Sequence, residues 1–300
     1  MSKNLYYSIF LLLITFFWGV TFPLIKVSLE YISPLPFLAL RFSVSTIIIL
    51  PFVMRKRQFR DRKAMIYGFW AGFYLMLGYV FQTIGLLYTS AGASGLITGL
   101  YVVILPLISI VYLKTRVSRI IIISSITAFT GLIIMSTGAF SGALGWFGDI
   151  LTMICAFAYA ANLAYLSKRA AEFDSYVFSF YQLLMVAVFS TLAIPFIPGE
   201  RFLLNTYVIF TILFTAIFAG VLAIFVTTKA MIYVEPSVAG IIFVGEPIFA
   251  ALTSVWLIDE HLSLYTIIGG TIMVIAIFIV TLSKYLENRS PASVSRFPET

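Results

Sequence analysis

Ten long runs of mostly apolar residues divide this 300-residue chain, separated by short polar or glycine-rich joints. A bilayer core about 30 Å thick needs roughly 20 apolar residues per helix, so each run is long enough to cross it. The runs are continuously apolar instead of alternating every second residue, which favours helices over barrel strands. We therefore predict an all-α integral membrane protein with ten transmembrane helices. They lie near residues 5–25, 34–54, 64–87, 92–113, 117–137, 146–166, 175–195, 206–228, 236–258 and 264–284.

The composition agrees with a membrane protein and argues against several other classes. Hydrophobic residues make up 61% of the chain and charged residues 10%, which leaves too little polar surface to cover a soluble globule. A single cysteine, Cys155, and a single histidine, His261, exclude a disulfide within the chain and a Cys/His metal site. The sequence has no recognisable catalytic nucleophile with its base and no glycine-rich phosphate loop. We therefore expect neither an enzyme nor a cofactor.

The lysines and arginines are distributed as expected for cytoplasmic loops. If the N-terminus is inside, sixteen of the 19 fall on the cytoplasmic side, six of them between residues 55 and 63. Lys26 and Arg201 fall outside, and Arg41 lies within a span. We therefore expect a multi-pass protein of the plasma (inner) membrane with both termini in the cytoplasm. This topology accounts for the net charge of +7 without a nucleic-acid partner.

The second half of the sequence resembles the first. At an offset of 145 residues, segment 87–118 aligns without gaps on segment 232–263, and Gly95 meets Gly240. Earlier in the chain the offset is 141 residues, so a four-residue difference falls between the second and third helices of each half. Chance similarity between apolar helices is the alternative, but the matched helix order and joint lengths favour duplication.

The duplicated unit predicts an inverted architecture. Five helices per unit is an odd number, so the second unit enters the membrane from the opposite side. We expect a first five-helix repeat over residues 1–140, a second over 141–285 and a short cytoplasmic tail over 286–300. Inverted repeats give secondary transporters two exchangeable conformations, with the substrate site near the midplane where the halves meet.

Four segments carry a family resemblance. They are FFWGVTFPLIK (16–26), PFLALRF (36–42), SAGASGLITGLYVVILPLISIVYL (90–113) and EPIFAALTSVWLIDEHLS (246–263). Together they resemble the ten-helix EamA-type branch of the drug/metabolite transporter superfamily, over essentially the whole chain to about residue 285. The resemblance implies export or exchange of small metabolites such as amino acids. One repeat has Tyr101 where the other has Glu246, so a carboxylate function is confined to one half.

Glu246 lies near the middle of a predicted span. It is the eleventh of 23 residues in the run 236–258, where a charged acid costs on the order of 2.5–3.5 kcal/mol. Such a residue needs water, a proton or a partner. Pro247 beside it removes a backbone donor and can kink the helix. Glu246 therefore either lines a cavity or couples protons, or it is a buried acid that serves folding alone.

Arg41 is a second charge within a span, and Gln182 occupies the matching position in the other repeat. The arginine side chain is long enough to reach the outer interface, and anchoring there is one interpretation. The other is that it grips a substrate carboxylate or an acid such as Glu246. Trp18 and Gly19 are candidates for a cavity wall, with lipid contact and simple packing as the alternatives.

Six more polar residues within the spans complete the set of cavity candidates, unless they serve only as interhelical hydrogen bonds. They are Thr21, Tyr79, Gln82, Tyr101, Tyr159 and Asn162. The fifth and tenth spans carry charge only near their ends, at Arg119 and Lys284, and few strong hydrogen-bonding side chains, so we expect the cavity among the other eight.

The sequence and the resemblance together predict a secondary transporter. It would move an amino acid or similar organic solute by alternating access, in export or exchange. The alternatives are an uncoupled facilitator and a drug or organic-cation efflux transporter. The expected partners are a small-molecule substrate and the lipid bilayer, with the chain working as a monomer or weak homodimer.

Overall fold

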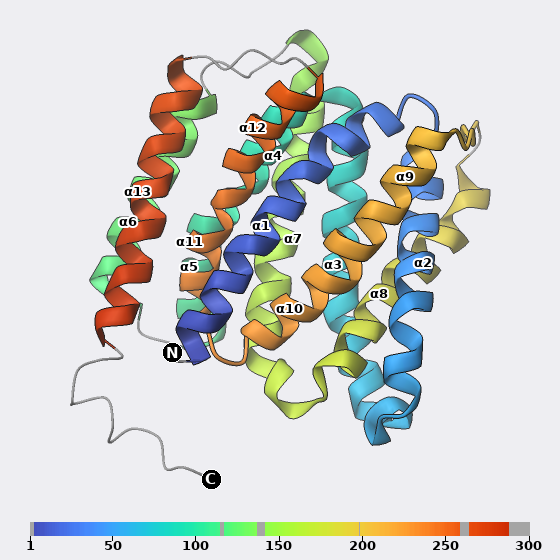
Figure 1. The fold of residues 1–300 in the computed structure, drawn as a ribbon, viewed down its shortest axis with the longest axis horizontal. Coiled ribbons are helices and arrows are strands. Elements are labelled where there is room, and N and C mark those ends of the chain that lie inside the picture. The colour runs from blue at the N-terminus through green and yellow to red at the C-terminus, as the bar shows by residue number, and fades with distance from the viewer. Residues whose placement is uncertain (1–2, 115–116, 137–141, 198, 259–263, 288–300) are drawn as a thin grey trace.

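A computed structural model describes residues 3–114, 117–136, 142–197, 199–258 and 264–287. Within these ranges the chain is almost entirely helical (Figure 1), with one isolated β-bridge between Ile32 and Phe202. The elements are α1 (Lys3–Ser28), α2 (Pro34–Met54), η1 (Arg57–Arg60), α3 (Arg62–Tyr88), α4 (Ala91–Thr98), α5 (Tyr101–Tyr112), α6 (Arg119–Ser136), α7 (Gly142–Arg169), η2 (Ala170–Glu172), α8 (Ser175–Ala193), η3 (Ile194–Phe196), α9 (Thr206–Phe214), η4 (Thr215–Leu222), α10 (Ala223–Ala230), α11 (Pro236–Phe243), α12 (Gly245–Ile258) and α13 (Leu264–Glu287).

The described helices fall on all ten predicted spans. Seven helical stretches are long and apolar enough to cross a bilayer, and shorter apolar helices occupy the other three spans, at Tyr101–Tyr112, Arg119–Gly131 and Ile267–Val280. The all-α membrane fold is therefore confirmed. Most of the predicted tail, from residue 288 onward, lies outside the described residues.

Large apolar side chains cover the outside of the helices. Val111, Phe196 and Trp256 are 78%, 84% and 87% exposed. Exposed apolar surface of this extent marks a membrane-facing protein, because lipid tails solvate it and water does not.

Two of the predicted spans are broken, and the breaks correspond. The span 92–113 divides into α4 and α5 after Gly99, and the span 236–258 divides into α11 and α12 at Val244. These residues are 145 apart, the offset of the sequence repeat, and their backbones agree: φ −57° and ψ −12° at Gly99, φ −59° and ψ −17° at Val244. A continuous helix was expected in both places. Paired interruptions of this kind are typical of binding sites in transporters.

A third predicted span, 206–228, is also irregular. It runs through α9, a π-helical segment η4 and α10. A π-helix widens the backbone turn and is frequent at functional sites. Nothing in the apolar pattern of this span indicated it.

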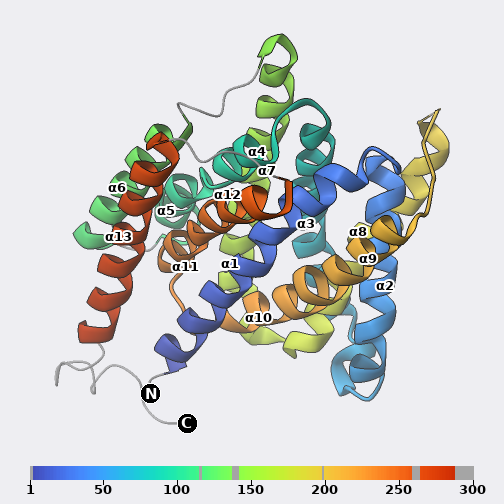
Figure 2. The same cartoon turned by 45° about the horizontal axis from the view of Figure 1, so that its top comes forward.

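The helices are arranged so that α6 and α13 stand at one side of the molecule (Figure 1, Figure 2). These two helices pack against each other, and α2, α8 and α9 lie on the opposite side of the molecule. Between these groups α3 packs on α7 and α8, and α1 packs on α12.

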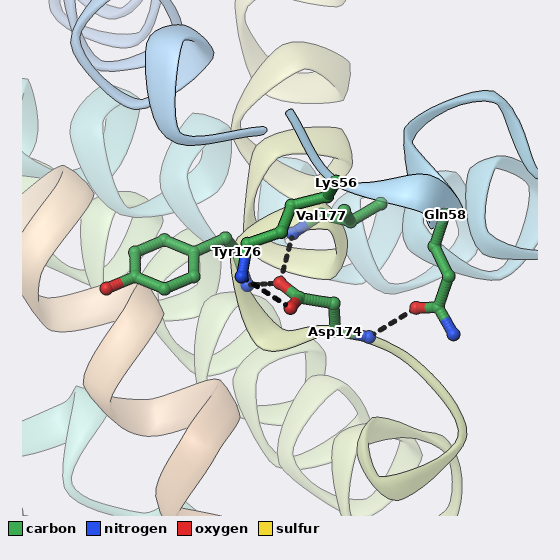
Figure 3. A network of polar contacts seen from close by, with 5 residues as sticks. All are labelled: Lys56, Gln58, Asp174, Tyr176 and Val177. Carbon is green, nitrogen blue, oxygen red and sulfur yellow. Dashed lines mark hydrogen bonds and ion pairs between the residues drawn. The ribbon is translucent and has the colours of Figure 1, made fainter. Parts of the chain in front are cut away.

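Asp174 joins the N-terminus of α8 to the turn between α2 and α3 (Figure 3). Its carboxylate accepts hydrogen bonds from the backbone N–H groups of Tyr176 (2.9 Å) and Val177 (3.4 Å), which the helix itself leaves without acceptors. It also forms an ion pair with Lys56 at 3.0 Å. The backbone N–H of Asp174 donates to Gln58 Oε1 at 2.5 Å. This turn of the first half is therefore tied to α8 of the second.

The other end of α2 is held in a corresponding way. Ser33 precedes α2 and lies 141 residues before Asp174, again a repeat offset. Its backbone N–H donates to the Arg201 carbonyl at 2.9 Å, and its Oγ accepts from the Arg201 backbone N–H at 2.8 Å. The segments that flank α8 thus hold both ends of α2.

Candidate functional site

A small cavity of about 40 Å³ lies among α1, α2, α3, α5, α7, α8, α10, α11 and α12. Ten of the eleven cavity candidates line it: Trp18, Thr21, Arg41, Tyr79, Gln82, Tyr101, Tyr159, Asn162, Gln182 and Glu246. No described residue of α6 or α13 contributes to the wall.

Glu246 and Tyr101 are in direct contact at the cavity. The Tyr101 hydroxyl lies 3.0 Å from Glu246 Oε2 and also 3.0 Å from the Phe243 carbonyl oxygen. Both side chains are buried, and Glu246 is 6% exposed. The two residues are 145 apart, the offset of the sequence alignment, so each half of the chain contributes one member of the pair.

The break between α11 and α12 explains how the chain accommodates Glu246. Because α12 starts at Gly245, the acid lies in the first turn of a helix. The helix dipole stabilises a carboxylate there, by about 0.3–1 kcal/mol. Pro247 has no N–H, so the carbonyl of Phe243, four residues earlier, lacks its usual helical donor. The Tyr101 hydroxyl takes that place.

Arg41 turns into the cavity and not toward the interface. It is 1% exposed, so of the two interpretations of this residue the structure agrees with the one that places it in the interior. Its Cζ lies 4.9 Å from the ring centroid of Phe42 and 4.8 Å from that of Tyr79, where the aromatic faces stabilise the cation. Within the described part of the chain, its Nε has no hydrogen-bond partner and no ion pair joins it to Glu246.

The carbonyl oxygen of Ala219, in the π-helical segment η4, collects donors from three other helices. Trp18 Nε1 lies 3.2 Å away, Arg41 Nη2 3.4 Å and the Tyr79 hydroxyl 3.5 Å. This backbone acceptor was missed in the sequence, since a carbonyl has no side-chain signal. Gly220 beside it is the one local hint.

Gly220 allows α2 to approach the π-helical segment closely. A Cβ at this position would lie 2.4 Å from Ser45 Oγ, which donates to the Ala216 carbonyl at 3.0 Å. The glycine therefore keeps α2 near enough for Arg41 to reach Ala219.

The cavity amides hold helices together as well as lining the wall. Gln82 Nε2 donates to Thr98 Oγ1 at 3.0 Å, and the Tyr159 hydroxyl donates to Gln82 Oε1 at 3.3 Å. Asn162 Nδ2 donates to Gln182 Oε1 at 3.2 Å. Interhelical bonding, offered above as an alternative to cavity lining, is thus present at the same residues.

Gly19 is the predicted cavity residue that lies elsewhere. It packs on the backbone of α12, where a Cβ would be 2.5 Å from Phe249 Cβ and 2.9 Å from the Glu246 carbonyl oxygen. The close approach of α1 and α12 brings Trp18 and Glu246 to one cavity.

A family model for EamA-like transporters matches the chain twice, at residues 5–137 and 146–282. The chain belongs to the EamA-like transporter family. This family is part of the drug/metabolite transporter superfamily, as the resemblance indicated.

Relatives of this EamA-like protein carry the same general description. A protein of Archaeoglobus fulgidus, named an uncharacterized transporter, is 33% identical over 282 residues, covering 93% of this chain and 87% of its own. The uncharacterized transporter YvbV of Bacillus subtilis is 26% identical over 263 residues, covering 82% and 86%. The fold is similar to a crystal structure with a TM-score of 0.76 at 17% identity, over 93% of this chain and 98% of that one.

Proposed function

We propose that this EamA-like protein is a secondary transporter that moves a small organic solute across the plasma (inner) membrane by alternating access. The observation that carries the proposal is the Tyr101–Glu246 contact at 3.0 Å, in a cavity bounded by both halves of the chain. Contact between residues at matching positions favours two inverted repeats, 1–140 and 141–285, that meet at the cavity. The matching helix breaks support the same architecture. Ten spans put both termini on one side of the membrane, and the distribution of lysines and arginines favours the cytoplasm.

The charges of the cavity favour a zwitterionic solute such as an amino acid. Arg41 offers a buried Nε donor, and a guanidinium suits a carboxylate. Thr227 Oγ1 is a second buried polar atom of the wall without a partner among the described residues. Glu246 supplies a negative group for an ammonium. The rings of Trp18 and Tyr79 offer apolar contact to the rest of the molecule.

An organic cation is the second candidate substrate, because Glu246 has no cationic partner among the described residues. Aromatic rings around an acid bind organic cations well. Arg41 at the same cavity opposes this, since it would repel a substrate without a carboxylate.

A thermal-shift screen of the purified protein against amino acids, nucleosides and organic cations tests the substrate class. A solute at one hundred times its Kd stabilises the folded state by about 2.7 kcal/mol. We expect amino acids to raise the Tm, and Arg41→Gln to abolish that shift. Stabilisation by organic cations that survives Arg41→Gln would instead establish the efflux alternative.

Coupling to protons depends on Glu246. Glu246→Gln keeps the size and some hydrogen bonding of the acid but cannot ionise, so we expect slower transport by a normally folded protein. Uptake into proteoliposomes across a range of pH measures this. A wild-type rate at every pH would make the acid structural and leave an uncoupled facilitator.

A further inference from the structure

The Tyr101 hydroxyl faces two acceptors with a single hydrogen. Phe243 O and Glu246 Oε2 both lie 3.0 Å from it. A phenol has one O–H donor, although its oxygen can also accept. The two contacts can both be hydrogen bonds only if Glu246 supplies a hydrogen of its own.

The protonation state of Glu246 therefore selects between two arrangements. A protonated Glu246 donates to the Tyr101 oxygen, and Tyr101 donates to the Phe243 carbonyl, so every group is satisfied. An ionised Glu246 attracts the phenol hydrogen, because a hydrogen bond to a charged acceptor is stronger. The proton of the acid leaves to solvent through the cavity, and the Phe243 carbonyl then loses its donor.

The helix offers the Phe243 carbonyl no replacement. Pro247, four residues later, has no N–H, so the usual helical hydrogen bond cannot form. Phe243 is 1% exposed and its carbonyl lies beside the break at Val244. A buried carbonyl without a donor is costly, and the break is the place where the backbone can move to relieve it.

We propose that Tyr101 is a positioning residue that couples the protonation of Glu246 to the break between α11 and α12. With the acid protonated, the phenol donates to the Phe243 carbonyl and holds the backbone at the break in place. With the acid ionised, the carbonyl loses this hydrogen bond and the backbone at the break becomes mobile. The inference rests on the proposed transport function, in which such a break opens and closes the cavity.

Other titratable groups near Glu246 do not offer the same connection. Tyr79 of α3, and Cys155 and Tyr159 of α7, lie within electrostatic reach of the acid. Arg41 of α2 lines the same cavity. In the described residues, α1, α4, α11 and α13 bring no titratable side chain to it. Tyr101 of α5 is the phenol that bonds both to the acid and to the broken helix.

Hydrogen–deuterium exchange of the purified full-length protein in lipid nanodiscs tests the proposal. Peptides covering residues 240–250 report exchange at the break. The exchange is measured from about pH 5 to about pH 9, the interval in which buried glutamates titrate. Peptides covering 95–105 report the matching break, which contains no acid. Rates are corrected for the intrinsic pH dependence of amide exchange. In the wild type we expect protection of 240–250 to fall about tenfold as the acid ionises, the factor for one lost buried hydrogen bond, with no such fall at 95–105.

Two variants should move the break in opposite directions. Tyr101→Phe removes the donor, so 240–250 should exchange fast at every pH. Glu246→Gln supplies a permanent N–H donor to the phenol, so 240–250 should stay protected at every pH. Tyr74→Phe, a control that removes a phenol hydroxyl of α3 outside the cavity, should keep the wild-type profile.

A wild-type pH profile in Tyr101→Phe, or a shift in the same direction in both variants, would overturn the proposal. If Tyr101→Phe does not fold, a Glu246→Gln protein that still loses protection at high pH overturns it equally. The measurement uses no substrate, so it is independent of the transport proposal. If the exchange experiment fails but solutes still stabilise the protein, the switch is refuted and the transport function is not. If the switch is confirmed but no solute binds or is transported, the transport function is refuted and the switch is not.

Discussion

Replacing Gly19 by alanine tests how α1 packs on α12 beside the cavity. The added carbon would lie 2.5 Å from Phe249 Cβ, 2.8 Å from the Ala250 nitrogen and 2.9 Å from the Glu246 carbonyl oxygen. Ordinary contact starts at 3.4 Å, so the shortest contact is too close by about 0.9 Å. Two of the three atoms belong to the backbone and cannot rotate away. The two helices must therefore separate.

The expected loss of stability follows from these contacts. Overpacking of this kind costs about 3 kcal/mol at the upper end of its usual range, and the better helix propensity of alanine returns about 1 kcal/mol. A net loss of about 2 kcal/mol lowers the Tm by roughly 4–8 °C. The separation also moves Trp18 away from Glu246, so the variant should lose the ligand-induced thermal shift as well.

Gly270→Ala is the matched control, because a Cβ at Gly270 in α13 meets no atom within 4 Å. The same chemical change should leave the Tm unchanged or slightly higher. Fluorescence-detected unfolding of both variants in one detergent compares them directly. Equal changes in Tm for Gly19→Ala and Gly270→Ala would refute the close-packing argument.

Three further predictions concern topology, the joint at α8 and the cavity. Alkaline phosphatase fused after residue 285 should be inactive, because both termini are expected in the cytoplasm; an active fusion contradicts the proposed topology. Asp174→Ala should lower the free energy of unfolding by about 1 kcal/mol through loss of the helix cap. Lys56→Ala should lower it by less, because the ion pair is partly exposed. A larger loss for Lys56→Ala than for Asp174→Ala in chemical denaturation would count against the capping role. In a cysteine-free background, Asn162→Cys should react with a hydrophilic maleimide and Ile126→Cys, which is 59% exposed on α6, should not; the opposite pattern would move the pathway.

The site shows where reasoning from the sequence succeeded and where it failed. The register of Glu246 with Tyr101 followed from the repeat offset, and the depth of Glu246 in the bilayer stays a prediction from the length of its span. That the two touch did not follow, because an alignment relates positions without bringing them together. The direction of Arg41 was also undetermined. A long side chain reaches either the interface or the interior, and the aromatic faces and Ala219 carbonyl that receive it come from other helices.

The sequence by itself determined that this protein lies in a bilayer, where its spans fall and which family it resembles. The reason is that the free energy of transfer into a bilayer is set residue by residue and adds up along an apolar run. Tertiary structure decided what happens inside the spans. Breaks at Gly99 and Val244, the π-helical turn and the contact at Gly19 depend on which backbone groups find partners on a neighbouring helix. In a medium without water, every such group must be satisfied within the protein, and the partners lie far away in sequence.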